Sequence, residues 1–255
     1  MELSRARILL TNDDGVYANG LKALERIARA LSDDIWIVAP ATEQSAASHS
    51  LTIARPLRVR QQSERGYAVD GTPTASVLIG VNQVLKDRRP DLILSGVNRG
   101  GNLGEDVTYS GTIAAAMEGT LLGIPSIALS QLATPDGPTK WATAETHAPG
   151  IIRKLAAAGW PKDVLINLNF PNLPPEEVSG ARLCVQGRRK LGSALLERHD
   201  PRGRPYYWID SARDEDPSLV GTDLHAVNSG AISITPLYLD LTHRATIESL
   251  AGAFP

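Results

Sequence analysis

The N-terminal region contains the segment ILLTNDDG, residues 8–15, in which an apolar run leads directly into two adjacent carboxylates and a glycine. Two neighbouring acids repel each other unless a partner compensates their charge. A divalent cation would do so, because hard cations bind carboxylate oxygens. A surface turn accounts for the same residues, since Asp and Gly are frequent in turns. From this segment alone, both interpretations stay open.

Apolar runs and amphipathic segments alternate from this segment to about residue 170. The expected strands cover residues 7–12, 35–39, 91–94, 124–129 and 164–168, and the expected helices cover 20–31, 72–85, 110–122 and 141–158. A short hairpin is expected within residues 57–69. Continuously apolar strands are typical of parallel sheets that are buried on both faces. The sequence therefore predicts an α/β fold with a mostly parallel sheet and helices on both faces.

The pattern changes after residue 170. Prolines cluster at positions 171, 174 and 175, the helical periodicity disappears, and a strand-like run covers 231–237. We expect residues 1–170 to form the catalytic core and residues 171–255 to form a β-rich extension, not an independent second domain. Cys184 lies in the apolar run RLCV of this extension and is expected in the core.

The composition excludes several classes of protein. The formal net charge of -2 provides no broad basic surface, so we expect neither a nucleic-acid polymer nor an anionic membrane as a partner. The single Cys184 rules out an intramolecular disulfide and a multi-cysteine zinc site. The N-terminus lacks an apolar core of signal-peptide length, and charge, Gly and Pro interrupt the apolar stretch 112–132. We therefore expect a cytoplasmic protein.

Polar residues follow three of the predicted strands at the points where those strands end. Asp13 and Asp14 follow the first strand, and Ser45 lies in the loop after the second. Asn98 follows the strand at 91–94. In an open parallel sheet, ligands bind beyond the carboxyl ends of the strands. Carboxylate, hydroxyl and amide oxygens suit Mg²⁺, Mn²⁺ or Ca²⁺, so the sequence predicts a divalent-metal site at this edge.

Two further segments point to an anion. Residues 110–112, Ser-Gly-Thr, start a predicted helix, where backbone N–H groups and the helix dipole favour phosphate. An ordinary N-cap explains the same residues, although the neighbouring metal cluster makes phosphate the better interpretation. The basic run 188–190 either forms a solvent-exposed surface or attracts a phosphorylated substrate. His49 is interpreted as a loop residue within reach of a substrate, because no partner in the sequence activates it.

Several common catalytic motifs are absent from the sequence. The first strand is not followed by G-x-G-x-x-G, and neither a P-loop, a G-x-S-x-G elbow nor an H-E-x-x-H zinc helix occurs. A phosphatase with an aspartyl nucleophile would need a second acid at position 15, which is Gly15. These absences argue against dinucleotide binding, P-loop NTPase activity and serine or zinc hydrolysis.

Ordered blocks along nearly the whole chain resemble the SurE family of stationary-phase survival proteins, which are metal-dependent 5'-nucleotidases. The blocks are ILLTNDDG at 8–15, VAP followed by QS at 44–45, DGTP at 70–73, SGVNRGGNLG at 95–104, YSGTIAAAMEG at 109–119, and GTD and SITPL in the C-terminal region. Blocks of this length in this order make chance agreement very rare.

The resemblance implies specific site residues and an assembly. It implies one divalent ion per subunit, Mn²⁺ or Mg²⁺, with the ligands Asp13, Asp14, Ser45 and Asn98. It places the phosphate near Asn102, Ser110, Gly111 and Thr112, and we add Asn12 to this phosphate-binding group. It also implies a Rossmann-like three-layer α/β/α sandwich, and a C-terminal β-hairpin extension that is exchanged between the subunits of a homodimer or homotetramer.

The implied reaction is hydrolysis of nucleoside 5'-monophosphates to nucleoside and phosphate. Hydrolysis of 3'-monophosphates and short polyphosphate stays open. In this mechanism the cation neutralises developing charge and orients a water, and Asp13 or Asp14 takes the proton of that water. The alternative is a non-catalytic metal-dependent nucleotide-binding module, which would use the same residues. A nucleotide-sugar transferase fits less well, because it would usually need an acid-x-acid pair.

Overall fold

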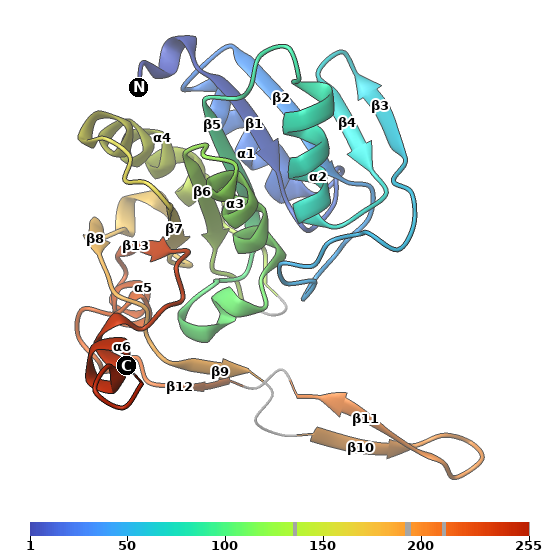
Figure 1. Cartoon of the computed structure of the whole chain (residues 1–255), viewed down its shortest axis with the longest axis vertical. Coiled ribbons are helices and arrows are strands. Elements are labelled where there is room, and N and C mark those ends of the chain that lie inside the picture. The colour runs from blue at the N-terminus through green and yellow to red at the C-terminus, as the bar shows by residue number, and fades with distance from the viewer. Residues whose placement is uncertain (135–136, 192–194, 211–212, 255) are drawn as a thin grey trace.

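A nine-stranded sheet runs through the part of the chain that the computed structural model describes, which is residues 1–134, 137–191, 195–210 and 213–254 (Figure 1). Its strands are β1 (Arg7–Thr11), β2 (Asp34–Pro40), β3 (Val59–Ser63), β4 (Gly66–Val69), β5 (Leu92–Arg99), β6 (Ser126–Gln131), β7 (Val164–Phe170), β8 (Ala181–Leu183) and β13 (Ile232–Tyr238). The strand order is β3-β4-β2-β1-β5-β6-β7-β13-β8. All pairs from β4 to β7 are parallel, whereas β3 pairs antiparallel with β4 and β13 antiparallel with β7.

Helices cover both faces of this sheet, as Figure 1 shows. On one face α1 (Asn19–Arg29) packs against α4 (Trp141–Ala158), and on the other α2 (Pro73–Ile79) packs against α3 (Gly111–Leu121). The π-helical turn η2 (Gly80–Val84) continues α2, so the predicted helix at 72–85 changes its winding near its end. The short 3-10 turns are η1 (Leu3–Arg5), η3 (Gly104–Thr108) and η4 (Pro175–Glu177). The predicted three-layer α/β fold is therefore confirmed.

Strand β1 explains why the apolar run before the two acids is continuous. Successive side chains of a strand point to opposite faces of the sheet. Ile8 and Leu10 pack into the core on the side of α1 and α4, whereas Leu9 packs into the core on the side of α2. All three are fully buried, and each contributes about 1.5–3 kcal/mol relative to an exposed side chain. This burial fixes the strand end from which Asp13 and Asp14 extend.

Strand β5 is longer than the predicted 91–94 and reaches Arg99. The continuation depends on Gly96, which has a φ of +134° and lies so close to β6 that an added Cβ would be 2.3 Å from the carbonyl oxygen of Leu129. The pairing of β5 with β6 shifts its register between Ser95 and Asn98. The glycine-rich loop expected from residue 95 therefore begins only after Arg99.

The C-terminal region contains both the expected strands and two helices that the sequence analysis did not predict. The remaining elements are β9 (Arg189–Leu191), β10 (Leu195–His199), β11 (Pro205–Ile209), β12 (Arg213–Glu215), α5 (Asp223–Asn228) and α6 (Arg244–Leu250). Helix α5 is short and is started by a cap, in which the Thr222 hydroxyl accepts a hydrogen bond from the backbone N–H of His225 at 3.2 Å. So short a helix gives no clear periodicity in the sequence.

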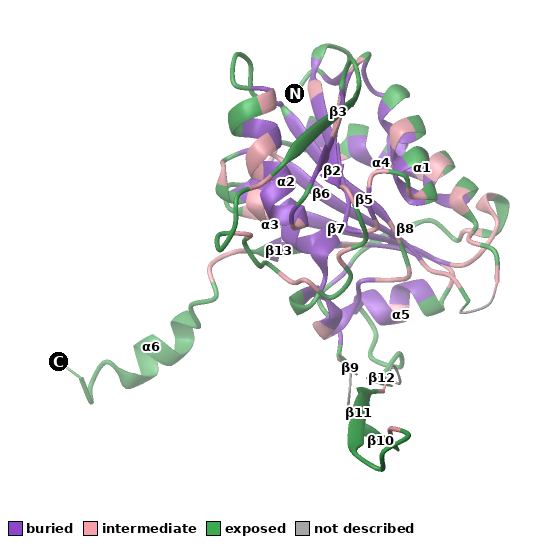
Figure 2. Ribbon diagram, turned by 90° about the vertical axis from the view of Figure 1, so that its right-hand side faces the viewer, coloured by how far each residue is buried: buried purple, intermediate pink, exposed green. Residues whose placement is uncertain are grey.

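Strands β8 and β13 from this region complete the central sheet, while β9 pairs with β12 and β10 with β11. Figure 2 shows the β10–β11 hairpin and α6 exposed, away from the buried sheet. Cys184 is buried, as predicted. None of the helices in the described ranges is long and apolar enough to cross a membrane. The division of the chain at residue 170 stays a prediction.

Candidate active site

A cavity of about 590 Å³ lies at the carboxyl edge of the central strands. Six of the predicted site residues line it: Asp13, Asp14, Ser45, Asn98, Asn102 and Ser110. They come from the loops after β1 and β2, the end of β5, the glycine-rich loop and the residue before α3. The structure therefore brings together residues that are distant in the sequence, at the edge where the parallel sheet was expected to bind ligands.

The other three predicted residues, Asn12, Gly111 and Thr112, lie behind the cavity wall. The Asn12 side chain donates to the carbonyl oxygen of Gly15 at 2.9 Å and so closes the turn that carries the two acids. A Cβ at Gly111 would lie 2.7 Å from the Cβ of Asp13. The Thr112 hydroxyl donates to Oδ1 of Asp13 at 2.5 Å. In this structure the three residues position Asp13 and its turn.

Asp13 is a buried carboxylate, with 6% of its surface exposed. Burial raises its pKa above the ordinary value, and the nearby Glu43 acts in the same direction. The hydrogen bond from Thr112 opposes this rise because it favours the charged form. The side chain is therefore held in one orientation in a site that disfavours its charge.

Asp14 shows most clearly how burial and the neighbouring acids disfavour a charged carboxylate. Burial, followed by repulsion from Asp13 and Glu43, raises its pKa from 3.8 to about 7. The backbone N–H of Arg99 donates to this carboxylate and only partly offsets the rise. Two acids whose mutual repulsion the protein offsets only in part form a site that fits a divalent cation.

Ser45 and Asn98 are the oxygen donors that would complete such a site. The Ser45 hydroxyl donates to Oε1 of Glu43 at 2.7 Å, and its oxygen keeps lone pairs for a cation. The Asn98 amide nitrogen donates to the carbonyl oxygen of Gly100 at 2.8 Å, which leaves the amide oxygen as the donor for a metal. Within the described ranges, no three His, Cys, Asp or Glu side chains gather into a metal site by themselves. The two carboxylates therefore need these neutral oxygens.

Ser110 caps helix α3, since its hydroxyl oxygen accepts from the backbone N–H of Ile113 at 3.1 Å. The capping interpretation of this segment is thus correct. It does not conflict with phosphate binding, because the hydroxyl can still donate and the helix start favours negative charge.

Asn102 is fixed by a buried polar network that the sequence analysis missed. Its backbone N–H donates to Oδ1 of Asn169 at 2.8 Å, and its side chain donates to the Ser130 hydroxyl at 2.8 Å. The Asn167 side chain donates to the carbonyl oxygen of Asn102, also at 2.8 Å. Asn167 and Asn169 alternate within the apolar run VLINLNF of β7, and this spacing placed them on one face of the strand. The network keeps Asn102 at the cavity wall.

Arginines complete the wall of the cavity. Arg99, Arg189 and Arg213 line it together with Asp106 and Tyr109. Only the run 188–190 had suggested a basic contribution, and of its members Arg189 reaches the cavity. His49 does not line the cavity; its Nε2 lies 3.0 Å from Oε2 of Glu118, a partner that is remote in the sequence.

The structure defines a Rossmann-like α/β protein whose polar cavity lies at the carboxyl edge of a parallel sheet. The family model described as survival protein SurE matches residues 8–193. The chain belongs to the SurE family, which confirms the resemblance.

Proteins named 5'-nucleotidase SurE are similar to this chain over nearly its whole length. The protein from Paramagnetospirillum magneticum is 62% identical over 98% of this chain and 96% of its own. The protein from Rhodospirillum rubrum is 57% identical over 99% of this chain and 98% of its own. The crystal structure of the SurE protein from Aquifex aeolicus superposes with a TM-score of 0.85 at 40% identity, covering 97% of this chain and 99% of that chain.

Proposed function

We propose that this protein is a metal-dependent 5'-nucleotidase, which hydrolyses nucleoside 5'-monophosphates to nucleoside and phosphate. The observation that carries the proposal is the Asp13–Asp14 pair, whose mutual repulsion is offset only in part and which shares one cavity with Ser110 at the start of helix α3. The relatives at 62% and 57% identity that are named 5'-nucleotidase SurE support the same activity. The same chemistry extends the proposal to 3'-monophosphates and short polyphosphate.

The metal in this proposal is one Mn²⁺ or Mg²⁺ ion per subunit, held by Asp13, Asp14, Ser45 and Asn98. When bound, such an ion supplies Lewis acidity toward a phosphoryl oxygen and lowers the pKa of a bound water. The donor set consists of hard oxygens only, which fits these ions and not a thiophilic metal.

The chain's own residues orient the substrate and move a proton. The Ser110 hydroxyl, at the start of helix α3, and the Asn102 side chain line the cavity and hold phosphoryl oxygens. Thr112 and Gly111 keep Asp13 in place. One of the two acids, Asp13 or Asp14, takes the proton of the attacking water.

The assembly that we propose is a homodimer or homotetramer formed through the C-terminal extension, in the cytoplasm. Its support is the exposed apolar surface of the β10–β11 hairpin, where Leu195, Trp208 and Ile209 are 65%, 63% and 71% exposed. Apolar patches of this kind mark interaction surfaces.

Phosphate release tests the function. Purified protein is incubated with AMP or GMP and with Mn²⁺, Mg²⁺ or EDTA, and released phosphate is measured. We expect metal-dependent release, which Asp13→Asn removes and which the control Asp33→Asn, at an exposed acid before β2, leaves unchanged. Nucleotide binding without release would favour the non-catalytic binding module instead.

A further inference from the structure

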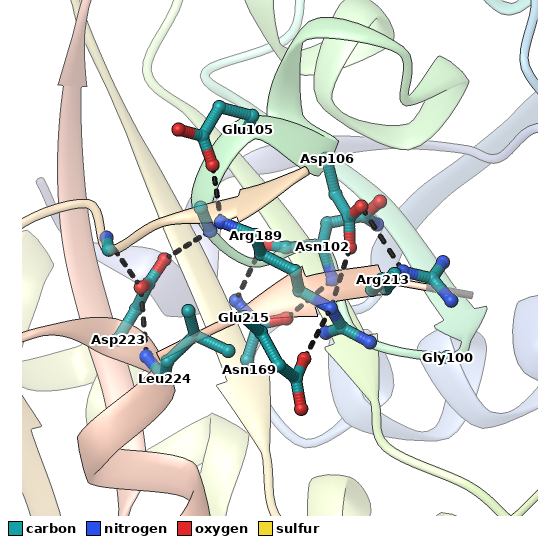
Figure 3. Close-up of polar contacts among 12 residues, drawn as sticks. Gly100, Asn102, Glu105, Asp106, Asn169, Arg189, Arg213, Glu215, Asp223 and Leu224 are labelled. Atoms are coloured by element: carbon teal, nitrogen blue, oxygen red, sulfur yellow. Dashed lines mark hydrogen bonds and ion pairs between the residues drawn. The ribbon is translucent and has the colours of Figure 1, made fainter. Parts of the chain in front are cut away.

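Three charged side chains meet at the wall of the active-site cavity, and two of them come from the C-terminal region. Asp106, on η3, lies between Arg189 on β9 and Arg213 on β12 (Figure 3). Its Oδ2 is 3.4 Å from Nε of Arg189, and its Oδ1 is 3.3 Å from Nε of Arg213. All three line the same cavity as Asp13 and Asp14. The proposed mechanism uses none of these three charged groups.

Arg189 has donors that the protein leaves available. Its nearest approaches to Asp106 and to Glu215, at 3.4 and 3.1 Å, are both made by Nε. Nε is fully buried without a hydrogen bond, and the guanidinium makes no hydrogen bond to any side chain or backbone group in the described ranges. The terminal nitrogens are therefore the donors that this side chain presents at the cavity wall. A planar guanidinium matches the oxygens of a phosphate in a bidentate manner.

The surrounding backbone holds Arg189 rigidly. Its N–H donates to Oε2 of Glu105, and the N–H of Gly187, two residues earlier, donates to Oδ1 of Asp223 at 2.8 Å. The other oxygen of Asp223 accepts from the N–H of Gly104 at 2.9 Å. Asp223 is fully buried. It thus ties the segment that carries Asp106 to the segment that carries Arg189, as Figure 3 shows.

The charges of this cluster show why a ligand fits it. Only 16% of the Arg189 side chain is exposed, and a buried cation is costly unless it is well paired. Asp106 is shared between two arginines, and Glu215, the second partner of Arg189, is 37% exposed. The ion pairs use Nε, and within the described ranges the edge formed by the two terminal nitrogens makes no hydrogen bond. A phosphate dianion in the cavity would satisfy that edge.

We propose that Arg189 contacts the phosphoryl oxygens of the substrate through its terminal guanidinium nitrogens, and that Asp106 is the residue that positions it. The inference rests on the proposed phosphatase function, and extends it by assigning a substrate contact to the C-terminal region. Arginines that clamp a transferring phosphoryl group stabilise the charge that develops in the transition state. Arg189 therefore acts on the phosphoryl group and not on the nucleoside.

The test compares Arg189→Met and Arg189→Lys with the matched control Arg188→Met. Arg188 is the preceding, exposed residue and does not line the cavity. With AMP and with p-nitrophenyl phosphate, which has no nucleoside, we expect Arg189→Met to lower kcat/KM by a factor of about 100. Arg189→Lys keeps the charge but loses the planar pair of N–H donors, and should lower kcat/KM by a factor of about 10. Guanidinium at sub-denaturing concentration should partly restore Arg189→Met but not Arg189→Lys.

Inorganic phosphate provides a readout that does not require turnover. Arg189→Met should weaken phosphate binding to the metal-loaded protein by a factor of about 10, measured by calorimetry, while Arg188→Met leaves it unchanged. Asp106→Asn should weaken it less, because Arg189 remains but is held less firmly. If the wild-type protein bound phosphate but hydrolysed none of the substrates, the proposed function would fail while Arg189 would still be tested by this binding.

Three results would overturn the proposal. The first is a loss of activity of Arg189→Met with AMP but not with p-nitrophenyl phosphate, which would show that Arg189 contacts the nucleoside and not the phosphoryl group. The second is an unchanged affinity for inorganic phosphate in Arg189→Met. The third is a lower melting temperature with full activity per folded molecule, which would make the cluster a purely structural ion pair.

Discussion

Replacing Asp14 by Asn is expected to stabilise the metal-free protein and to remove its response to metal. Burial and the neighbouring Asp13 and Glu43 raise the pKa of Asp14 from 3.8 to about 7. Because the folded-state pKa is above the unfolded-state value, the stability associated with this group is fully present below about pH 3.8. It is lost as the pH rises through about 7. Asn carries no charge at any of these pH values and avoids this loss.

The magnitude follows from the two pKa values. A difference of about 3 pH units, at roughly 1.4 kcal/mol per unit, sets an upper limit of about 4 kcal/mol on the increase in the free energy of unfolding that the substitution can give. Asn still buries a polar group, so we expect Asp14→Asn to gain about 2 kcal/mol at pH 8 and less than about 1 kcal/mol at pH 5. In a chain of this size, a gain of about 2 kcal/mol raises the melting temperature by roughly 4–8 °C.

Thermal unfolding followed by circular dichroism in EDTA, at pH 5, 6.5 and 8, measures this effect. The control is Asp33→Asn, at an exposed position, which should change the melting temperature little at any pH. Addition of Mn²⁺ at pH 8 should stabilise the wild type and Asp33→Asn but not Asp14→Asn. An Asp14→Asn protein that is no more stable than the wild type at pH 8, or whose gain does not grow between pH 5 and 8, would refute the reasoning.

Three further substitutions test Asp13 and the two residues of α3 that hold it in place. Asp13→Asn should lower kcat by two to three orders of magnitude, measured as phosphate release at saturating Mn²⁺; a rate near that of the wild type would remove Asp13 from the mechanism. Thr112→Val deletes the hydrogen bond to Asp13 and should weaken Mn²⁺ binding about 10-fold by calorimetry, whereas unchanged affinity would show that Asp13 needs no such support. Gly111→Ala places a Cβ 2.7 Å from that of Asp13 and should cost roughly 1–3 kcal/mol of stability. Its melting temperature should fall, and a value equal to the wild type would mean that α3 shifts freely.

The acid pair and its edge of the sheet were predictable because the determinants are local. An apolar strand that runs into Asp13 and Asp14 is visible in a few residues, and the alternation of strands and helices then locates the strand end. Ser45 and Asn98 follow from the same rule, since carboxyl ends of parallel strands share one edge. The structure brings all four to one cavity.

The rest of the cavity depends on contacts that no local pattern reveals. Asn102 is fixed by Asn169 on β7, which lies two strands away from β5 in the sheet, and Asp106 meets Arg213, which is 107 residues later in the chain. Each partner alone looks like an ordinary polar residue. Thr112 was expected to hold phosphate, but a hydroxyl at a helix start can equally donate to a neighbouring carboxylate. Only the three-dimensional arrangement shows its hydrogen bond to Asp13.

The cavity draws its charges from both sides of residue 170. Residues before this point supply the acids and Arg99, whereas Arg189 and Arg213 come after it. The buried Asp223 ties the two parts together through Gly104 and Gly187. The acids alone create a site that repels the negative charge of a phosphate. Cations are therefore needed at the same cavity, and a metal held by Asp13 and Asp14 would account for only part of that need. The C-terminal region, which could be read as an appendage for assembly, thus adds the fixed positive charges of Arg189 and Arg213 to that of Arg99, and this charge helps the acidic half of the site to attract phosphate.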